Sequence, residues 1–270
     1  MKNANGFSQE HLLYLKKQRR KSACVTFWRI ALLAILLGFW ELLADTESVN
    51  PFITSSPSRI VTTFCSLYTE GKLFYHVGVT LGETLVGFVI AVAGGYLIAL
   101  LLWWNDTLRK ILEPYIVVLN SLPKIALGPL IIIWCGTGSK AIIAITVLVG
   151  IIISIMNMLG GFSATDKGKI LLMQSMGANK RQILIKLVIP SSLPAFISML
   201  KINVGMAWIG SIMGEYIVSK AGLGYLIVYG GQVFKLDLVM TATVILCVLA
   251  GVMYFLVALL EKLTVKSDET

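Results

Sequence analysis

The sequence predicts an all-α, polytopic membrane protein with about six transmembrane helices. Of its 270 residues, 57% are hydrophobic and only 14% are charged, whereas soluble domains carry roughly 25% charged residues. Six apolar stretches reach the length of about 20 residues that a helix needs to cross a bilayer. They cover residues 26–44, 78–103, 111–134, 140–160, 193–218 and 238–260. We therefore expect a basic tail over residues 1–25 and one transmembrane domain over residues 26–264.

The basic residues predict how these stretches are oriented. No A-x-A cleavage site ends the first stretch, so we expect it to stay as a membrane anchor. Lysine and arginine collect on the cytoplasmic side of membrane proteins. With the N-terminus inside, sixteen of the 23 basic residues are cytoplasmic, five are outside and two lie in spans. This distribution predicts cytoplasmic N- and C-termini.

Two segments between the stretches are predicted to lie outside. In residues 57–68, Ile60, Phe64, Leu67 and Tyr68 have helical spacing, which predicts an amphipathic helix at the outer surface. Residues 219–236 carry GLG at 222–224 and a glycine pair at 230–231, where we expect tight turns.

Residues with the chemistry of an enzyme or a metal site are sparse. The cysteines Cys24, Cys65, Cys135 and Cys247 form no CxxC pair, and both histidines lie far from any cluster. We expect no metal site, no disulfide framework and no catalytic residue.

The most informative segment is a polar one, residues 165–194, which the charge distribution places in the cytoplasm. Its first part, 167–176, is expected to be a helix that Gly177 ends, because glycine tolerates the left-handed conformation found there. Asn179 is expected to cap a second short helix, and Pro190 and Pro194 mark the return to the membrane. Such a helix pair suits docking into a groove of another protein.

The same segment resembles the EAA loop of the permease subunits of binding-protein-dependent ABC importers. The similarity lies in MGA at 176–178, LVIP at 187–190 and LP at 193–194. Further motifs resemble the branch that imports nitrate, sulfonates, taurine and related small solutes. These motifs are SLPKIALGPL at 121–130, WCGTG at 134–138, GMAW at 205–208, GE at 214–215 and GLG at 222–224.

The resemblance implies a type I ABC importer permease fold with cytoplasmic coupling helices. It also implies two cytoplasmic ATPase subunits, a second permease copy, as a homodimer or a pair of related permeases, and an extracytoplasmic solute-binding protein. The resemblance further implies the plasma (inner) membrane of a prokaryote. The coupling loop would cover 165–190, with ATPase contacts from Met173, Met176, Gly177, Ala178, Asn179 and Lys180. Two residues depart from the family pattern: Leu171 stands where the loop usually has glutamate, and Glu83 where the second span usually has arginine.

ATP hydrolysis is expected on the partner rather than on this chain. A phosphate loop requires G-x-x-x-x-G-K-[ST], and the nearest match is at Gly168-Lys169. There, Ser163 replaces the first glycine and Ile170 replaces the hydroxyl residue. We expect this chain to be no enzyme and to hold no cofactor, with ATP and Mg on the ATPase.

Polar residues inside the spans are candidates for the translocation pathway, because polar groups in a bilayer usually face protein or water. Asn120, Ser121, Lys124 and Gly128 fall within one ~100° sector of a helix, and Lys124 could attract an anion. The alternatives are that Lys124 snorkels or pairs with Glu113, and that Asn120 bonds to a neighbouring helix. Further candidates are Asn203 and Ser211 in the fifth span, and Glu215 near its outer end, as a gate, a binding-protein contact or a plain interfacial carboxylate.

The predicted function is a permease for a small solute, an anion such as a sulfonate, taurine or nitrate. Relatives of similar sequence serve thiamine precursors, riboflavin or other vitamin-like solutes, so these substrates stay open. A stand-alone secondary transporter is a more distant alternative, because it would favour acidic residues at mid-span. A membrane enzyme would need a convergent constellation of His, Asp or Ser, which we do not find in the sequence.

Overall fold

Helices make up every regular element in residues 9–46 and 55–264, the part of the chain that this computed structural model describes. The first eight residues of the basic tail, including Lys2, and the C-terminal Lys266 lie outside these ranges. The chain divides into two compact units, residues 1–63 and 64–270. Each unit is described separately.

The first unit holds one long helix and the start of a second. The helix α1 (Gln9–Asp45) contains an apolar span, Cys24–Ala44, of which only 6% is buried, as expected for side chains that face lipid. The helix α3 (Pro57–Thr69) begins beside the end of α1, where the Ser58 N–H donates to Glu41 Oε2 at 3.0 Å. A helix was predicted here, and it is confirmed.

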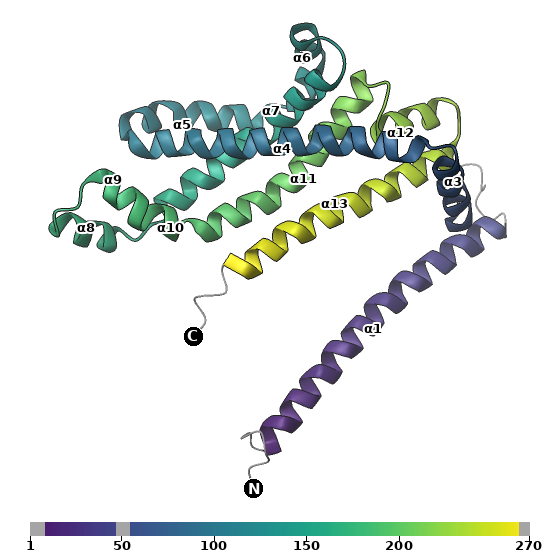
Figure 1. Cartoon of the computed structure of the whole chain (residues 1–270), viewed down its shortest axis with the longest axis horizontal. Helices are drawn as coiled ribbons and strands as arrows, with labels where there is room; N and C mark the ends of the chain where they lie inside the picture. The colour runs from purple at the N-terminus through teal and green to yellow at the C-terminus, as the bar shows by residue number, and fades with distance from the viewer. Residues whose placement is uncertain (1–8, 47–54, 265–270) are drawn as a thin grey trace. The chain divides into compact units, whose positions relative to one another are not determined.

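Three long helices form the centre of the second unit. These are α4 (Lys72–Trp104), α7 (Ser139–Ser163) and α11 (Leu193–Val218), which run side by side (Figure 1). They pack closely because small residues lie at their contacts. A Cβ at Gly210 of α11 would come within 2.6 Å of the Thr146 Cα of α7. All three helices confirm predicted spans.

The third predicted span is not one straight helix. It consists of α5 (Asp106–Ser121), the 3₁₀ turn η1 (Lys124–Leu127) and α6 (Gly128–Cys135), with a bend of 88° at the break. Pro123 has no N–H to continue the α5 hydrogen bonds. The described residues thus contain five helices able to cross a membrane, or six if the bent pair counts as one span.

The chain then returns through two further helices. The helix α12 (Leu223–Gln232) is short, and α13 (Leu236–Thr264) is the last predicted span. The Lys201 Nζ of α11 pairs with Glu261 Oε2 of α13 at 2.5 Å. The prediction of a tight turn at Gly230 and Gly231 was wrong, because both lie within α12 and the turn follows at Phe234, where φ is +54°.

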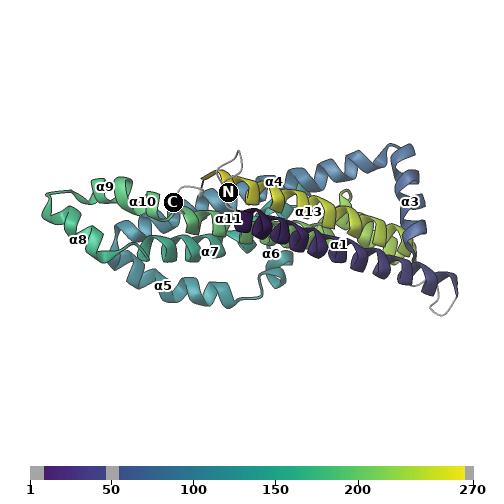
Figure 2. The same cartoon turned by 90° about the horizontal axis from the view of Figure 1, so that it is seen from below.

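The polar segment emerges at one end of the central bundle. It contains α8 (Lys167–Ser175), α9 (Lys180–Ile183), the π-helical turn η2 (Leu184–Val188) and α10 (Ile189–Ser191). Figure 2 shows α8 and α9 beyond the ends of α5 and α7. We call this the α8–α9 end of the bundle and the opposite one the α12 end.

Candidate functional site

The α8–α9 element, residues 166–183, is held by its own polar groups. The Asp166 carboxylate accepts the Gly168 N–H at 2.7 Å at the start of α8. At the end of α8, the Ala178 N–H donates to the Met173 carbonyl at 2.9 Å and the Gly177 N–H to the Gln174 carbonyl at 2.9 Å. This is a Schellman motif with Gly177 at φ +81°. The predicted break at Gly177 is confirmed.

The second short helix begins with a capping box. Asn179 Oδ1 accepts the Gln182 N–H at 2.9 Å, and Gln182 Oε1 accepts the Asn179 N–H at 2.8 Å. Two N–H groups at the helix start are thereby satisfied reciprocally. The predicted cap at Asn179 is confirmed, and the whole turn from α8 to α9 has a defined backbone.

One face of this element packs into the chain itself. Its last residue, Ile183, is buried in one apolar cluster together with Leu184 and Val188 of the following η2. The cluster also takes one or more residues from each central helix: Ala99 of α4, Met158 and Phe162 of α7, and Met199 of α11. Met173 and Ala178 pack against the edge of this cluster. The element and η2 thus share one apolar cluster with all three central helices.

The other face of the element is apolar and exposed. Leu171 is 63% exposed, Leu172 60% and Met176 79%. Single exposed apolar residues are ordinary, but a group of them marks an interaction surface. Met176 was predicted to belong to such a surface, whereas Leu172 was not singled out and Leu171 was noted only for the absent glutamate. Met173 instead packs partly against the chain's own core.

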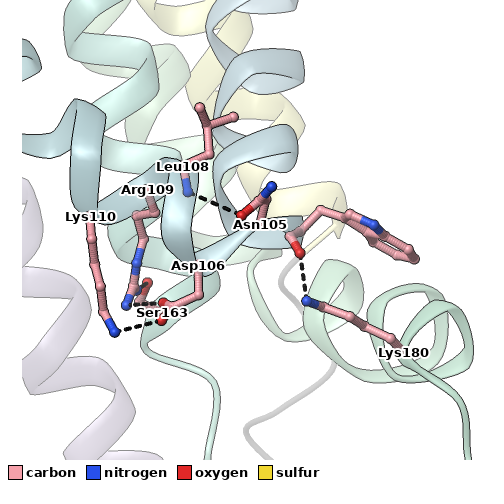
Figure 3. A network of polar contacts seen from close by, with 8 residues as sticks. Asn105, Asp106, Leu108, Arg109, Lys110, Ser163 and Lys180 are labelled. Carbon is pink, nitrogen blue, oxygen red and sulfur yellow. Dashed lines mark hydrogen bonds and ion pairs between the residues drawn. The ribbon is translucent and has the colours of Figure 1, made fainter.

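Lys180 joins the element to the end of α4. Its ammonium donates to the carbonyl oxygen of Trp104 at 2.5 Å and lies 5.8 Å and 5.5 Å from the ring centroids of Trp103 and Trp104. The last carbonyls of a helix have no partner within the helix and carry partial negative charge. A lysine is therefore well matched to this position, and Figure 3 draws the hydrogen bond of Lys180 as a dashed line.

The same corner ties α4, α5 and α7 together (Figure 3). Asn105 caps α5 by accepting the Leu108 N–H at 3.0 Å. Asp106 pairs with Arg109 at 2.7 Å and with Lys110 at 2.9 Å. Arg109 also donates to Ser163 Oγ, at the end of α7, at 3.5 Å. Of these contacts, the one between Arg109 and Ser163 joins residues 54 positions apart, and local patterns gave no signal for it.

The structure brings two predicted pathway residues together at the bend. Lys124 Nζ donates to Asn120 Oδ1 at 3.2 Å and to the Asn120 carbonyl at 3.3 Å. Ser121 Oγ donates to the Val117 carbonyl at 3.1 Å. The predicted common helical sector for these residues and Gly128 was wrong, because α5 ends at Ser121 and the chain bends there. Their part in a pathway stays a prediction.

The other predicted pathway residues are buried among the helices of one chain. Asn203 Nδ2 donates to the Met199 carbonyl at 3.0 Å, and Ser211 Oγ lies 2.7 Å from Thr84 Oγ1 of α4. Glu215 is only 1% exposed and accepts the Gly224 N–H of α12 at 2.6 Å. A surface contact between Glu215 and a partner would require a different conformation. The pathway roles of all three also stay predictions.

Within the described ranges 9–46 and 55–264, no group of three or more His, Cys, Asp or Glu side chains could hold a metal ion. The α8–α9 element instead presents exposed apolar side chains on a fixed backbone, with basic residues around them.

Comparison with known proteins shows the family of this chain. Residues 91–266 match the family described as binding-protein-dependent transport system inner membrane component. The chain belongs to this family. It is a multi-pass permease of an ABC importer, and the matched residues include the whole α8–α9 element.

Named relatives differ in the solute that they carry. This permease is 33% identical over 191 residues to the formylaminopyrimidine transport permease protein ThiX of Halalkalibacterium halodurans, covering 71% of this chain and 76% of ThiX. It is 26% identical to the taurine transport system permease protein TauC of Escherichia coli, covering 82% of each chain. A bacterial alginate ABC transporter solved with its periplasmic protein shares the fold, with a TM-score of 0.64 at 12% identity, over 94% of this chain and 95% of that one.

Proposed function

We propose that this permease forms the translocation pathway of an ATP-driven importer, with ATP hydrolysed on separate cytoplasmic ATPase subunits that dock on the α8–α9 element. The observation that carries the proposal is the element's two faces. One exposes Leu171, Leu172 and Met176, and the other packs against α4, α7 and α11. Movement of a docked ATPase would therefore reach all three central helices through direct packing.

The α8–α9 end is the cytoplasmic end in this proposal. Lys167, Lys169 and Arg181 lie on or beside the element, and Arg109 and Lys110 begin α5 at the same end. Positive charge near span ends favours the cytoplasm. The last turns of α13 lie at the same end of the bundle, since Glu261 of α13 pairs with Lys201 in the N-terminal half of α11. The α12 end then faces the extracytoplasmic binding protein.

A second copy of this permease completes the pathway. No residue of α5 is buried, although the helix carries the polar residues Asn120 and Ser121. Polar residues within a membrane usually face protein or water. A pathway between two copies would use the exposed sides of α5 and of the bend at Lys124, and a homodimer is the simplest such pair.

Two solute classes are candidates. The Lys124 ammonium, half-buried at the bend, favours a small anion such as taurine or another sulfonate. The identity of 33% with a formylaminopyrimidine permease favours a heteroaromatic thiamine precursor. A thermal-shift screen of the cognate binding protein decides between them: stabilisation by taurine, alkanesulfonates or nitrate supports the first, and stabilisation by aminopyrimidines the second.

The importer proposal is tested by co-expression with the ATPase and binding protein and by uptake into vesicles. We expect the ATPase to copurify and uptake to require ATP. Met176→Glu should reduce ATPase copurification at least fivefold, because it places a charge in the apolar surface. Val61→Glu, at a comparably exposed apolar residue of α3, is the matched control and should retain the ATPase. Gradient-driven uptake by this chain alone would overturn the proposal in favour of a secondary transporter.

A further inference from the structure

The start of α12 is capped by side chains from other helices. Gly222 precedes α12 and offers no side-chain cap of its own. Side chains of α4 and α11 accept the N–H groups of four consecutive residues instead. The Gly222 N–H donates to His76 Nδ1 at 3.0 Å, Leu223 to Thr80 Oγ1 at 2.8 Å, and Gly224 and Tyr225 to Glu215 Oε2 at 2.6 Å and 3.3 Å.

All three acceptors are buried. His76 is 8% exposed, Thr80 0% and Glu215 1%. The first N–H groups of a helix have no partner within the helix and favour a negative charge nearby. Oε2 of Glu215 supplies an acceptor for two of these groups. Separation of α12 from these side chains would leave several buried polar groups without partners, which is costly.

Backbone conformation shows how tightly the two parts fit. Gly222 has φ +109° and ψ 170°, a region that is open almost only to glycine. A Cβ at Gly222 would overlap the Glu215 carboxyl group, and one at Gly224 would lie 2.9 Å from Glu215 Oε2. Because neither glycine has a side chain, the backbone at the start of α12 can lie directly against the Glu215 carboxyl group. Glu215 of the GE motif and the glycines of the GLG motif are thus in contact with each other.

The cap has a further neighbour in Glu83 of α4. This residue is 5% exposed and lies near Glu215 and Ser139, and its Oε2 is buried without a hydrogen-bond partner among the described residues. It stands where the family usually has arginine. In this permease, therefore, the side chain beside Glu215 is a second carboxyl group, and Glu215 is free of an arginine partner at that position.

We propose that Glu215 is a positioning residue for transport, which fixes α12 to α4 and α11 so that the three move as one body at the end that receives the solute. The inference rests on the proposed function for its orientation. Glu215 acts through the α12 backbone and needs no contact with solute. If α12 were not fixed by Glu215, it would no longer move together with α4 and α11 at the outer end of the pathway. The α8–α9 element would still bind the ATPase.

Amide hydrogen exchange of the purified permease tests the contact without any partner protein. Glu215→Ala should speed exchange at residues 222–225 at least tenfold, whereas Glu215→Gln, which keeps an oxygen acceptor, should change it much less. Thr80→Val should speed exchange at Leu223. Thr84→Val is the matched control, because Thr84 is equally buried on α4 but bonds to Ser211. Unchanged exchange in both Glu215→Ala and Thr80→Val would overturn the contact.

Reconstitution with the ATPase and binding protein tests the role in transport. We expect Glu215→Ala to lower uptake at least tenfold while ATP hydrolysis persists, and Glu215→Gln to restore at least half of the uptake. Unchanged uptake, or a parallel loss of uptake and hydrolysis, overturns the positioning role. If the wild-type protein shows no ATP-driven uptake, the proposed function fails and the transport role with it, whereas the exchange result still decides the contact.

Discussion

At both ends of the α4–α7–α11 bundle, a helix terminus is bonded to side chains of distant helices. The contact is exposed to solvent at one end and buried at the other. At the α8–α9 end, Lys180 reaches the Trp104 carbonyl from an exposed position. At the α12 end, Glu215, Thr80 and His76 hold the start of α12 almost entirely out of solvent. Exposed contacts exchange readily with water, whereas buried ones are costly to leave unmade. One end is thus suited to change partners and the other to stay intact.

The largest effect is expected from Gly222→Ala at the α12 end. The backbone conformation at Gly222 adds strain of about 1–3 kcal/mol for any other residue, and the added Cβ overlaps the Glu215 carboxyl. We expect a clear drop in the thermal midpoint of the purified permease. Gly231→Ala is the control, because no atom lies within 4 Å of that Cβ and alanine favours a helix interior. Equal midpoints for the two variants would contradict the close fit at Gly222.

A smaller structural effect with a large functional one is expected from Gly177→Val at the α8–α9 end. A Cβ there meets no atom within 4 Å, so the penalty is the left-handed backbone alone, about 1–2 kcal/mol. The turn would shift, and we expect coupled uptake to fall at least tenfold while membrane insertion continues. Gly177→Asn serves as the matched variant because asparagine tolerates this conformation. Full uptake by Gly177→Val would show that coupling does not depend on this turn.

The smallest effect is expected from Lys180→Met. The variant loses one hydrogen bond and two ring contacts on an exposed residue, and we expect the thermal midpoint to change by only a few degrees. Uptake per ATP hydrolysed should fall two- to threefold if the link to α4 helps to transmit movement. Lys169→Met, at an exposed lysine of α8, is the control. An equal uptake per ATP hydrolysed in Lys180→Met and Lys169→Met would show that Lys180 has only a local structural role.

Sequence patterns predicted the features that depend on neighbouring residues. The spans follow from apolar length, and Gly177 and Asn179 follow from the preferences of helix ends. The α5–α6 bend was only half predicted: the prolines indicated an interruption, but the sector drawn through Asn120 and Lys124 assumed a continuous helix. The helix α12 was missed, because Gly230 and Gly231 indicated turns. Its start is stabilised by Glu215 of α11 and by acceptors on α4 that lie more than 140 residues earlier in the chain.

The candidate site divides in the same way. Met176 was predicted from its place beside the MGA motif, and it is exposed. Met173 was assigned to the same surface, but it packs against the edge of the apolar cluster. The spacing of residues along α8 does not tell which face of the helix the bundle covers. The contact of Lys180 with Trp104 joins residues 76 positions apart, and no local pattern marks it.

The turn between α8 and α9 also affects the thermodynamics of docking. Its backbone groups are satisfied by the Schellman motif and by the Asn179–Gln182 capping box, so its conformation is set before any partner arrives. Ordering a free loop on binding loses about 1–2 kcal/mol of backbone entropy per residue. A partner that docks on Leu171, Leu172 and Met176 avoids this loss, and its association and release need not wait for a loop to fold.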